Sequence, residues 1–323
     1  MHTLHTWQFI LDSLLQQQAV MLLYVLESKG SSPGRQGFMM AVNQHKQLQG
    51  SIGGGIMEQK LIELSFQQVK NKRKKIPALQ EQVHDKNTSK KQSGMICSGE
   101  QTIAFYAVKQ SDIPAIRNMV RCLKANENAS FQLTPERITF SKKIPSKNYT
   151  WKKVGDDSYR MMEKLGFKNE LHIIGGGHCS LALSKLFAEM DFRIHVYDDR
   201  PQLNTFEQNN YAHHKHVLGS YDEVKNLIPQ GEHVYVVIMT IGYRSDARVL
   251  ASIIQQRYRY IGMLGSKTKV TKLFHDFRLQ HIPESLLEKV HAPIGLSIQS
   301  ETSSEIAVSI AAEIISVKNK DRK

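Results

Sequence analysis

The spacing of apolar residues in the first part of the chain changes from helical to extended and back. Trp7, Ile10 and Leu11 recur every three or four positions, which is typical of a helix with one buried face. The largely apolar run over 19–28 is instead typical of a buried strand. The same reasoning predicts the other elements, which are strands at 38–42, 48–52 and 102–108 and helices at 56–70 and 111–123. We therefore predict an α/β domain over residues 1–125.

The next segment, 126–168, is polar and basic and has no long periodic run. Two short strand candidates stand out, "SFQLT" at 130–134 and "RITFS" at 137–141. We predict that this segment is a basic linker or a hairpin insert between two domains.

Residues 169–323 show the most regular pattern, in which apolar runs alternate with helical spacing. Strands are predicted at 171–175, 193–198, 214–218, 234–240 and 260–265, and helices at 178–190, 245–256, 266–279 and 303–316. Strands that alternate with helices in this way form a parallel sheet covered on both faces. The fold class is therefore α/β, with a Rossmann-like, doubly wound parallel sheet in the C-terminal domain.

Length and composition agree with two globular domains, since the chain has 323 residues and 41% of them are apolar. No apolar run approaches the roughly 18 residues of a membrane span, and the first residues lack the order of a signal peptide. We expect a cytoplasmic protein with no membrane partner. Its three cysteines, Cys97, Cys122 and Cys179, are far apart and indicate neither a disulfide framework nor a structural zinc site.

Charge is unevenly distributed along the chain, whose net charge is +13. Residues 1–168 carry 25 Lys and Arg against 13 Asp and Glu, whereas residues 169–323 carry 18 against 17. Such an excess attracts anionic partners, although the lysine-rich runs also suit solvated loops. We expect no nucleic-acid partner, because the basic residues lack interleaved aromatics and no helix-turn-helix or finger pattern occurs.

The stretch "LHIIGGGHCSLAL" runs from a strand through glycines into a helix. Gly175 and Gly177 would allow a tight turn beside the pyrophosphate of a dinucleotide, and Asp198 falls where an acid meets a ribose hydroxyl. His178, at the start of the helix, is a candidate for a phosphate contact or only an exposed cap. Ser180 replaces the third glycine of the motif, which weakens the match. The glycine turn and Asp198 make NAD(P) a candidate cofactor.

Two further turns follow strands of the same domain, at the edge where open α/β sheets bind ligands. Asp246 stands just beyond one strand, where it is either a ligand contact or a helix-start carboxylate. Gly265, Ser266 and Lys267 combine free amides, a hydroxyl and a cation, which suits an anion or an ordinary helix cap.

The first domain contains two glycine-rich loops, 28–37 and 50–59, whose bare amides are suited to an anion-binding nest. Glu58 is either a contact for a polar ring edge or a carboxylate stabilised by the helix dipole. The candidate binding residues in these loops are Ser31, Ser32, Arg35, Gly53, Gly54, Gly55 and Glu58.

Cys97 lies between glycines in "GMICSGE", ahead of an apolar strand. Its thiol would be reactive if nearby amides or cations stabilised the thiolate, and a packing role is equally consistent with the sequence.

Taken in order, eight stretches of the chain resemble the XdhC/CoxI family of accessory proteins for molybdenum hydroxylases. They are "GSSPGRQGFMM", "GSIGGGIMEQKLIE", "GMICSGE", "IIGGGHCSLAL", "VYDDRP", "VVIMTIGYRSDARVL", "YIGMLGSK" and "APIGLSIQSETSSEIAVSIAAEII". The resemblance implies a chaperone without turnover of its own. Such a protein binds the molybdenum cofactor, supports its sulfuration by a cysteine desulfurase and delivers it to a xanthine-dehydrogenase-like apoenzyme. The resemblance is compatible with a homodimer. It also implies that Cys97 contacts molybdenum or its sulfur.

Three positions depart from the family pattern. Ser98 interrupts the usual Cys-Gly-Gly, Ile56 stands where some members have a second cysteine, and Tyr243 stands where a histidine is common. The rival hypothesis is an NAD(P)-dependent oxidoreductase, which rests on the glycine turn and Asp198. Against it, no clear acid/base constellation accompanies that turn, although Tyr243 and His178 leave acid/base chemistry open.

Overall fold

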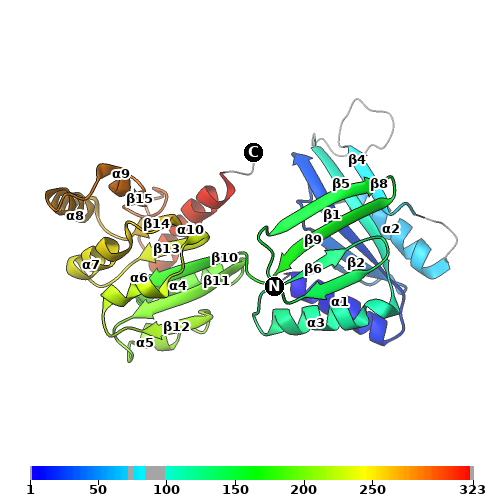
Figure 1. Ribbon diagram of the computed structural model, residues 1–323, viewed down its shortest axis with the longest axis horizontal. Coiled ribbons are helices and arrows are strands. Elements are labelled where there is room, and N and C mark those ends of the chain that lie inside the picture. Colours follow the sequence, from blue (N-terminus) through cyan, green and yellow to red (C-terminus); the bar gives the residue numbers. More distant parts are fainter. Residues whose placement is uncertain (1, 72–75, 84–98, 321–323) are drawn as a thin grey trace. The chain divides into compact units, whose positions relative to one another are not determined.

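The computed structural model describes residues 2–71, 76–83 and 99–320. The chain divides into two compact units, Met1–Gly166 and Phe167–Lys323 (Figure 1). Each unit has its own hydrophobic cores.

The first unit is built on a five-stranded sheet with the order β3-β2-β1-β5-β4. All of its neighbouring strands run antiparallel. The long central pair, β1 and β5, extends from Val20 opposite Val108 to Gly30 opposite Gly99. The strands are β1 Val20–Gly30, β2 Met39–Asn43, β3 Leu48–Gly50, β4 Leu79–Val83 and β5 Gly99–Val108. The sequence pattern does not indicate β4, because "LQEQV" carries little apolar character.

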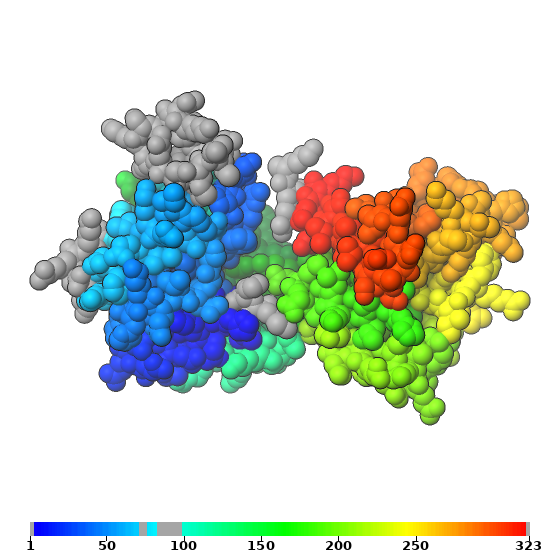
Figure 2. All heavy atoms as spheres, turned by 180° about the vertical axis from the view of Figure 1, so that it is seen from behind, coloured from blue at the N-terminus to red at the C-terminus, as the bar shows by residue number. Residues whose placement is uncertain are grey.

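Side chains alternate between the two faces of this sheet, and both faces are buried. On one face, Met21 and Leu23 pack with α2 (Gly55–Asn71), which lies on the outer surface of the unit (Figure 2). On the other, Leu22 and Tyr24 pack against Trp7 of α1 (His2–Leu15) and against α3 (Ile113–Lys124). The unbroken apolar run of β1 therefore reflects a strand covered on both sides.

A second antiparallel sheet, with the order β7-β6-β9-β8, covers the same face as α1. Its strands are β6 Ala129–Leu133, β7 Ile138–Ser141, β8 Tyr149–Gly155 and β9 Ser158–Leu165. The two strand candidates are confirmed as β6 and β7. Residues 126–168 are thus not a linker but form antiparallel hairpins, the other alternative that the sequence left open. They belong to the first unit, which extends to Gly166 rather than ending at 125.

The physical reason lies in the alternation along β9. Tyr159, Met161 and Leu165 point inward to the core, while Arg160 and Lys164 lie between them and raise the apparent polarity of the segment. Phe131 of β6 reaches the Trp7 ring edge-on, at 5.2 Å between centroids. A segment that looks basic on average is thus a half-buried sheet.

The second unit is a six-stranded parallel sheet with the order β12-β11-β10-β13-β14-β15. Its strands are β10 Asn169–Ile174, β11 Phe192–Asp198, β12 His214–Val217, β13 Gly231–Ile238, β14 Tyr258–Met263 and β15 Val290–His291. This is the predicted doubly wound sheet. The order reverses between β10 and β13, so the loops after these strands flank the topological switch point.

Helices cover both faces of the parallel sheet (Figure 1). Leu183 of α4 (His178–Phe187) and Ile310 of α10 (Ser303–Asn319) pack on one face. The other face is covered by α6 (Val224–Leu227), α7 (Tyr243–Ile253) and α8 (Lys267–Leu279). The short helices are α5 Asn204–Glu207 and α9 Glu284–Leu287. Among the described residues, no helix combines the length and apolar character needed to cross a membrane.

Candidate functional site

Three glycine-containing segments of the first unit meet at one end of the five-stranded sheet. A Cβ atom on Gly34 would lie 1.9 Å from the carbonyl oxygen of Ile52. On Gly99 it would lie 2.5 Å from the amide nitrogen of Ser32. Only glycine permits backbones to approach this closely, so the loops around residues 34 and 53 and the start of β5 form one structure.

Gln101 of β5 holds these loops together. Its side-chain nitrogen donates hydrogen bonds to the carbonyl oxygens of Gly34, at 2.7 Å, and of Ile52, at 3.3 Å. The side chain is 1% exposed, and its Oε1 has no hydrogen-bond partner among the described residues. The sequence pattern did not single out Gln101. The one indication in the sequence was a glutamine directly before the apolar run of 102–108.

The candidate thiol, Cys97, lies outside the described residues, as does Ser98. The nearest described residue is Gly99, which pairs with Gly30 across β1 and β5. The role of Cys97 therefore stays a prediction. Cys122 and Cys179 are both free.

Glu58 binds the glycine loop that precedes its own helix. Its Oε2 accepts hydrogen bonds from the amides of Ile52, at 2.8 Å, and Gly54, at 2.9 Å, and from Ser51 Oγ, at 2.7 Å. The loop is the anion-binding nest that the sequence predicted. Its anion, however, is the carboxylate of Glu58, so the Gly54 amide is not free for an external ligand.

The other residues of these loops differ in accessibility. Ser32 is buried and donates through Oγ to the carbonyl oxygen of Gly34, at 2.7 Å, which is a structural role. Ser31, Arg35 and Gly55 are exposed. The Arg35 Nη1 donates to the Gly30 carbonyl oxygen at 2.9 Å, which places an accessible cation over the loop.

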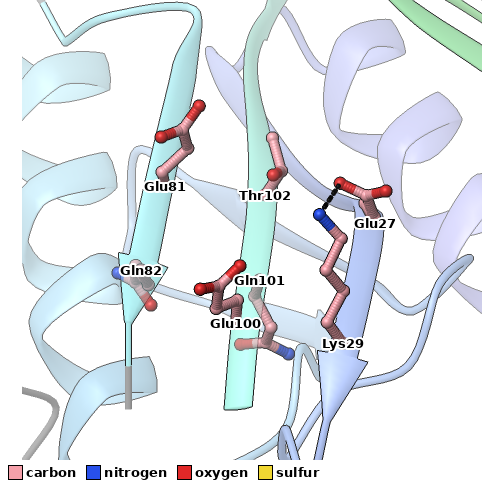
Figure 3. Close-up of a pocket in the computed structure, with 7 residues that line it drawn as sticks. All are labelled: Glu27, Lys29, Glu81, Gln82, Glu100, Gln101 and Thr102. Carbon is pink, nitrogen blue, oxygen red and sulfur yellow. Dashed lines mark ion pairs between the residues drawn. The ribbon is translucent and has the colours of Figure 1, made fainter. Parts of the chain in front are cut away.

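A pocket of about 220 Å³ opens beside the start of β5, on strands β1, β4 and β5 (Figure 3). Three carboxylates line it, from Glu27, Glu81 and Glu100, and one ammonium group, from Lys29, forms an ion pair of 3.6 Å with Glu27. Carboxylates in excess repel an anion. The pocket therefore does not suit a phosphate, and the accessible cation of Arg35 lies on the neighbouring loop instead.

In the second unit, the glycine turn after β10 has the expected geometry at its first position. Gly175 has φ +110°, and a Cβ atom there would lie 2.2 Å from the Met239 carbonyl oxygen. Gly177 is different, since its φ is −72° and no atom of the part of the chain that the structure describes lies within 4 Å of a Cβ atom. His178 begins α4 and is exposed, and the N-cap residue, Gly177, has no side chain with which to cap this helix start. Open space and uncapped amides suit an anion.

Asp198 is completely buried, and both of its carboxylate oxygens are occupied. Arg200 donates from Nε to Oδ1 at 2.9 Å and from Nη2 to Oδ2 at 2.8 Å, and the Gly176 amide donates to Oδ2 at 2.6 Å. Burial alone would raise the pKa of Asp198, but the hydrogen bonds from Arg200 and Gly176 hold that pKa below its ordinary value. The Asp198 carboxylate is thus bound by the protein itself. Its side-chain partner is Arg200 of "VYDDRP", which the sequence pattern did not single out.

Asp246, in the first turn of α7, is also fully buried. Its Oδ1 accepts hydrogen bonds from the amide of Thr240, at 3.1 Å, and from the Thr240 hydroxyl, at 2.5 Å, while its other oxygen forms an ion pair with Lys269. Of the two interpretations that the sequence left open, the structure favours a helix-start carboxylate.

The cation that pairs with Asp246 follows β14, but it is not the lysine that the sequence pattern predicted. Ser266 caps α8 by accepting a hydrogen bond from the Lys269 amide at 3.2 Å. Lys267 is exposed, and Gly265 is half-buried. Lys269, two residues beyond the predicted lysine, is therefore the cation that contacts Asp246.

Comparisons with known proteins identify the same two parts of the chain. Residues 13–80 match the model of the XdhC and CoxI family, and residues 171–314 match that of the XdhC Rossmann domain. An uncharacterized protein, YqeB, from Escherichia coli is 32% identical over 157 residues, which are 48% of this chain and 28% of the relative. A probable xanthine dehydrogenase subunit from Bacillus subtilis is 26% identical over 162 residues, 49% of this chain and 46% of the relative.

The match thus spans less than half of either relative's length. Among solved structures, a xanthine dehydrogenase from Bacillus halodurans superposes with a TM-score of 0.69 at 21% identity, covering 98% of this chain and 96% of that one. At this identity the superposition supports the fold, with both units included. Together with the two family models, these similarities show that the chain belongs to the XdhC and CoxI family and carries an XdhC Rossmann domain.

Proposed function

We propose that this protein takes part in the maturation of a xanthine-dehydrogenase-type enzyme by binding the molybdenum cofactor and delivering it to the apoenzyme. One observation carries the proposal, which is the convergence of three glycine-containing segments at the end of β1 and β5, next to the segment that holds Cys97. The family membership of the chain and the name of the Bacillus subtilis relative support the same role.

The residues of this end of the sheet fit a ligand with an anionic group and a soft metal. Arg35 is an accessible cation. The amide of Gly54 is bound to Glu58, but a ligand can approach the Cα of Gly54, since no atom of the described residues lies within 4 Å of a Cβ atom there. Gln101 contributes a buried amide oxygen that has no partner among the described residues. The pterin of the cofactor carries a phosphate, which Arg35 would hold. The thiol of Cys97 would meet molybdenum or its sulfur, since thiolates are soft ligands.

The charge distribution supports an anionic cargo. Residues 1–168, which contain these loops, carry 25 basic and 13 acidic residues. A field of this sign raises the local concentration of an anion and speeds its association. In this scheme a cysteine desulfurase supplies the sulfur for sulfuration, and the protein itself holds and shields the cofactor.

The test is to express the full chain in cells that make molybdopterin and to measure molybdenum and pterin in the purified protein. We expect both to be retained by the natural chain and reduced severalfold in Cys97→Ala. Cys122→Ala is the matched control, because Cys122 is buried in α3 and bonds internally to the Glu127 carbonyl oxygen, at 3.3 Å. Equal retention by Cys97→Ala, or full activation of the target hydroxylase by that variant, would remove the thiol from the mechanism.

A further inference from the structure

Histidines from three neighbouring strands form a stack on one face of the parallel sheet. His172 of β10 pairs in register with His195 of β11, and His195 pairs with His214 of β12. Paired residues of adjacent strands point to the same face. The imidazole rings accordingly stack, with centroids 4.5 Å apart for His172 and His195 and 4.7 Å apart for His195 and His214.

Glu170 completes a set of metal-ligating groups, because it precedes His172 by two positions on the same strand. The ligand atoms of Glu170, His172 and His195 all lie within 4.8 Å of one another. His172 Nε2 lies 3.4 Å from Glu170 Oε2. This separation is about that of two ligands in a tetrahedral zinc site, where the bonds to nitrogen and oxygen are about 2.0–2.1 Å.

The other ring nitrogens are held by neighbouring side chains. His172 Nδ1 lies 2.9 Å from the hydroxyl of Tyr197, and His195 Nδ1 lies 3.3 Å from Nε2 of His216. Metal-binding histidines characteristically have such a partner on the second nitrogen, which fixes the ring. His195 Nε2, by contrast, is shielded from solvent and has no hydrogen-bond partner among the described residues. A buried nitrogen without a partner is unfavourable unless something binds it.

The protonation states agree with this geometry. Burial lowers the pKa of His172, and burial together with His172 and His214 lowers the pKa of His195 to about 3. The hydrogen bond with His172 lowers the pKa of Glu170 to about 2. Burial thus favours the neutral imidazole, which is the form of histidine that binds a metal.

We propose that Glu170, His172 and His195 bind one divalent transition-metal ion, of the class of Zn²⁺, with a fourth position open to water. Two nitrogens and one oxygen from the protein form a donor set that borderline metals prefer. The Glu170 side chain is 19% exposed, which provides access for the ion. Binding would tilt the two stacked rings, now 14° from parallel, toward the shared ion. The site belongs to the second unit and the glycine loops of residues 28–37 and 50–59 to the first, and this proposal does not rest on the proposed function.

The test uses the full chain in a Cys97→Ser background, stripped with a chelator and titrated with Zn²⁺ by calorimetry and with Co²⁺ by visible absorption. We expect one equivalent to bind, with cobalt ligand-field bands and no thiolate charge-transfer band. His172→Gln and His195→Gln should each weaken binding at least tenfold, and Tyr197→Phe by about 10- to 100-fold. His214→Gln is the matched control, since His214 stacks on His195 but is exposed and outside the ligand set.

Circular dichroism of each variant separates lost binding from lost folding. Glu170→Gln serves if a histidine variant does not fold, because its side chain lies nearer the surface. The proposal is overturned if the natural chain binds no Zn²⁺, if His195→Gln or Glu170→Gln binds as tightly as the natural chain, or if a thiolate charge-transfer band assigns the metal to the remaining cysteines.

Discussion

The carboxylate of Asp198 is clamped by Arg200, whose guanidinium donates to both oxygens at 2.9 and 2.8 Å. In a dinucleotide-binding domain, an acid at this place would meet a ribose hydroxyl. Here the guanidinium of Arg200 binds the Asp198 carboxylate instead, and the Gly176 amide also donates a hydrogen bond to its Oδ2. The fold of the second unit is that of a Rossmann domain, but its acidic residue stabilises the glycine turn from within.

We predict that this clamp contributes to stability and limits dinucleotide binding. Arg200→Ala should lower the free energy of unfolding by about 2–3 kcal/mol, because it leaves a buried carboxylate with fewer donors. The natural chain should show no saturable binding of NAD(P)H in a fluorescence titration. Arg278→Ala is the control, since its ion pair with Glu284 is exposed and contributes little to stability. Tight dinucleotide binding with turnover of a carbonyl substrate would restore the oxidoreductase hypothesis.

The lowered pKa of Asp198 predicts a pH dependence. Because that pKa is lower in the folded than in the unfolded chain, the contribution of Asp198 to stability is complete above the unfolded pKa of about 3.9 and is lost as the pH falls through the folded value. Asp198→Asn removes this contribution. Urea unfolding should therefore show a gap between the natural chain and the variant at pH 7 that narrows below about pH 4. A gap of constant size would show that Asp198 is not the titrating group.

The two glycines of the turn after β10 should respond differently to the same substitution. Gly175→Ala should cost at least about 2 kcal/mol, because φ is +110° and the new methyl group would meet the Met239 carbonyl oxygen. Gly177→Ala should cost at most about 1 kcal/mol, since its φ is −72° and the space is open. Thermal unfolding checks both values. Similar losses at the two positions would contradict the backbone contact at Gly175.

Glu58 should stabilise the loop that it binds. Glu58→Gln keeps the size of the side chain but removes the charge that three donors share, so we expect a loss of about 1–3 kcal/mol. Glu63→Gln on the same helix is the matched control, because its ion pair with Lys46 is exposed. Denaturant titrations measure both. If Glu58→Gln lowers cofactor retention without lowering stability, Glu58 contacts the cofactor instead.

Arg35 offers a direct probe of the anion that the first unit is proposed to bind. Arg35→Glu reverses an exposed charge that donates a hydrogen bond to the Gly30 carbonyl oxygen, so folding should change by less than about 1 kcal/mol. Pterin retention should fall severalfold, and the loss should be smaller at high salt. Unchanged retention would place the phosphate elsewhere, for example at the open turn of Gly177.

Local patterns in the sequence were sufficient for most elements and for the turns. The alternation of strands and helices after residue 169 predicted the parallel sheet, and the glycines at 175 and 177 predicted a strand-to-helix turn. Segments whose buried residues alternate with charges were missed, as in β9, because their average composition resembles that of a solvated loop.

The sequence by itself determined the class of fold, the two-part organisation and the family, since these depend on periodicity and on motifs within short windows. Only the tertiary structure decided which polar groups are available. Glu58, Asp198 and Asp246 each appeared as a candidate contact for a ligand, and each is bonded within the protein. The partners that occupy them, Arg200 and Lys269 among them, and the stacked histidines of three strands are fixed by strand order and packing, which no local pattern in the chain records.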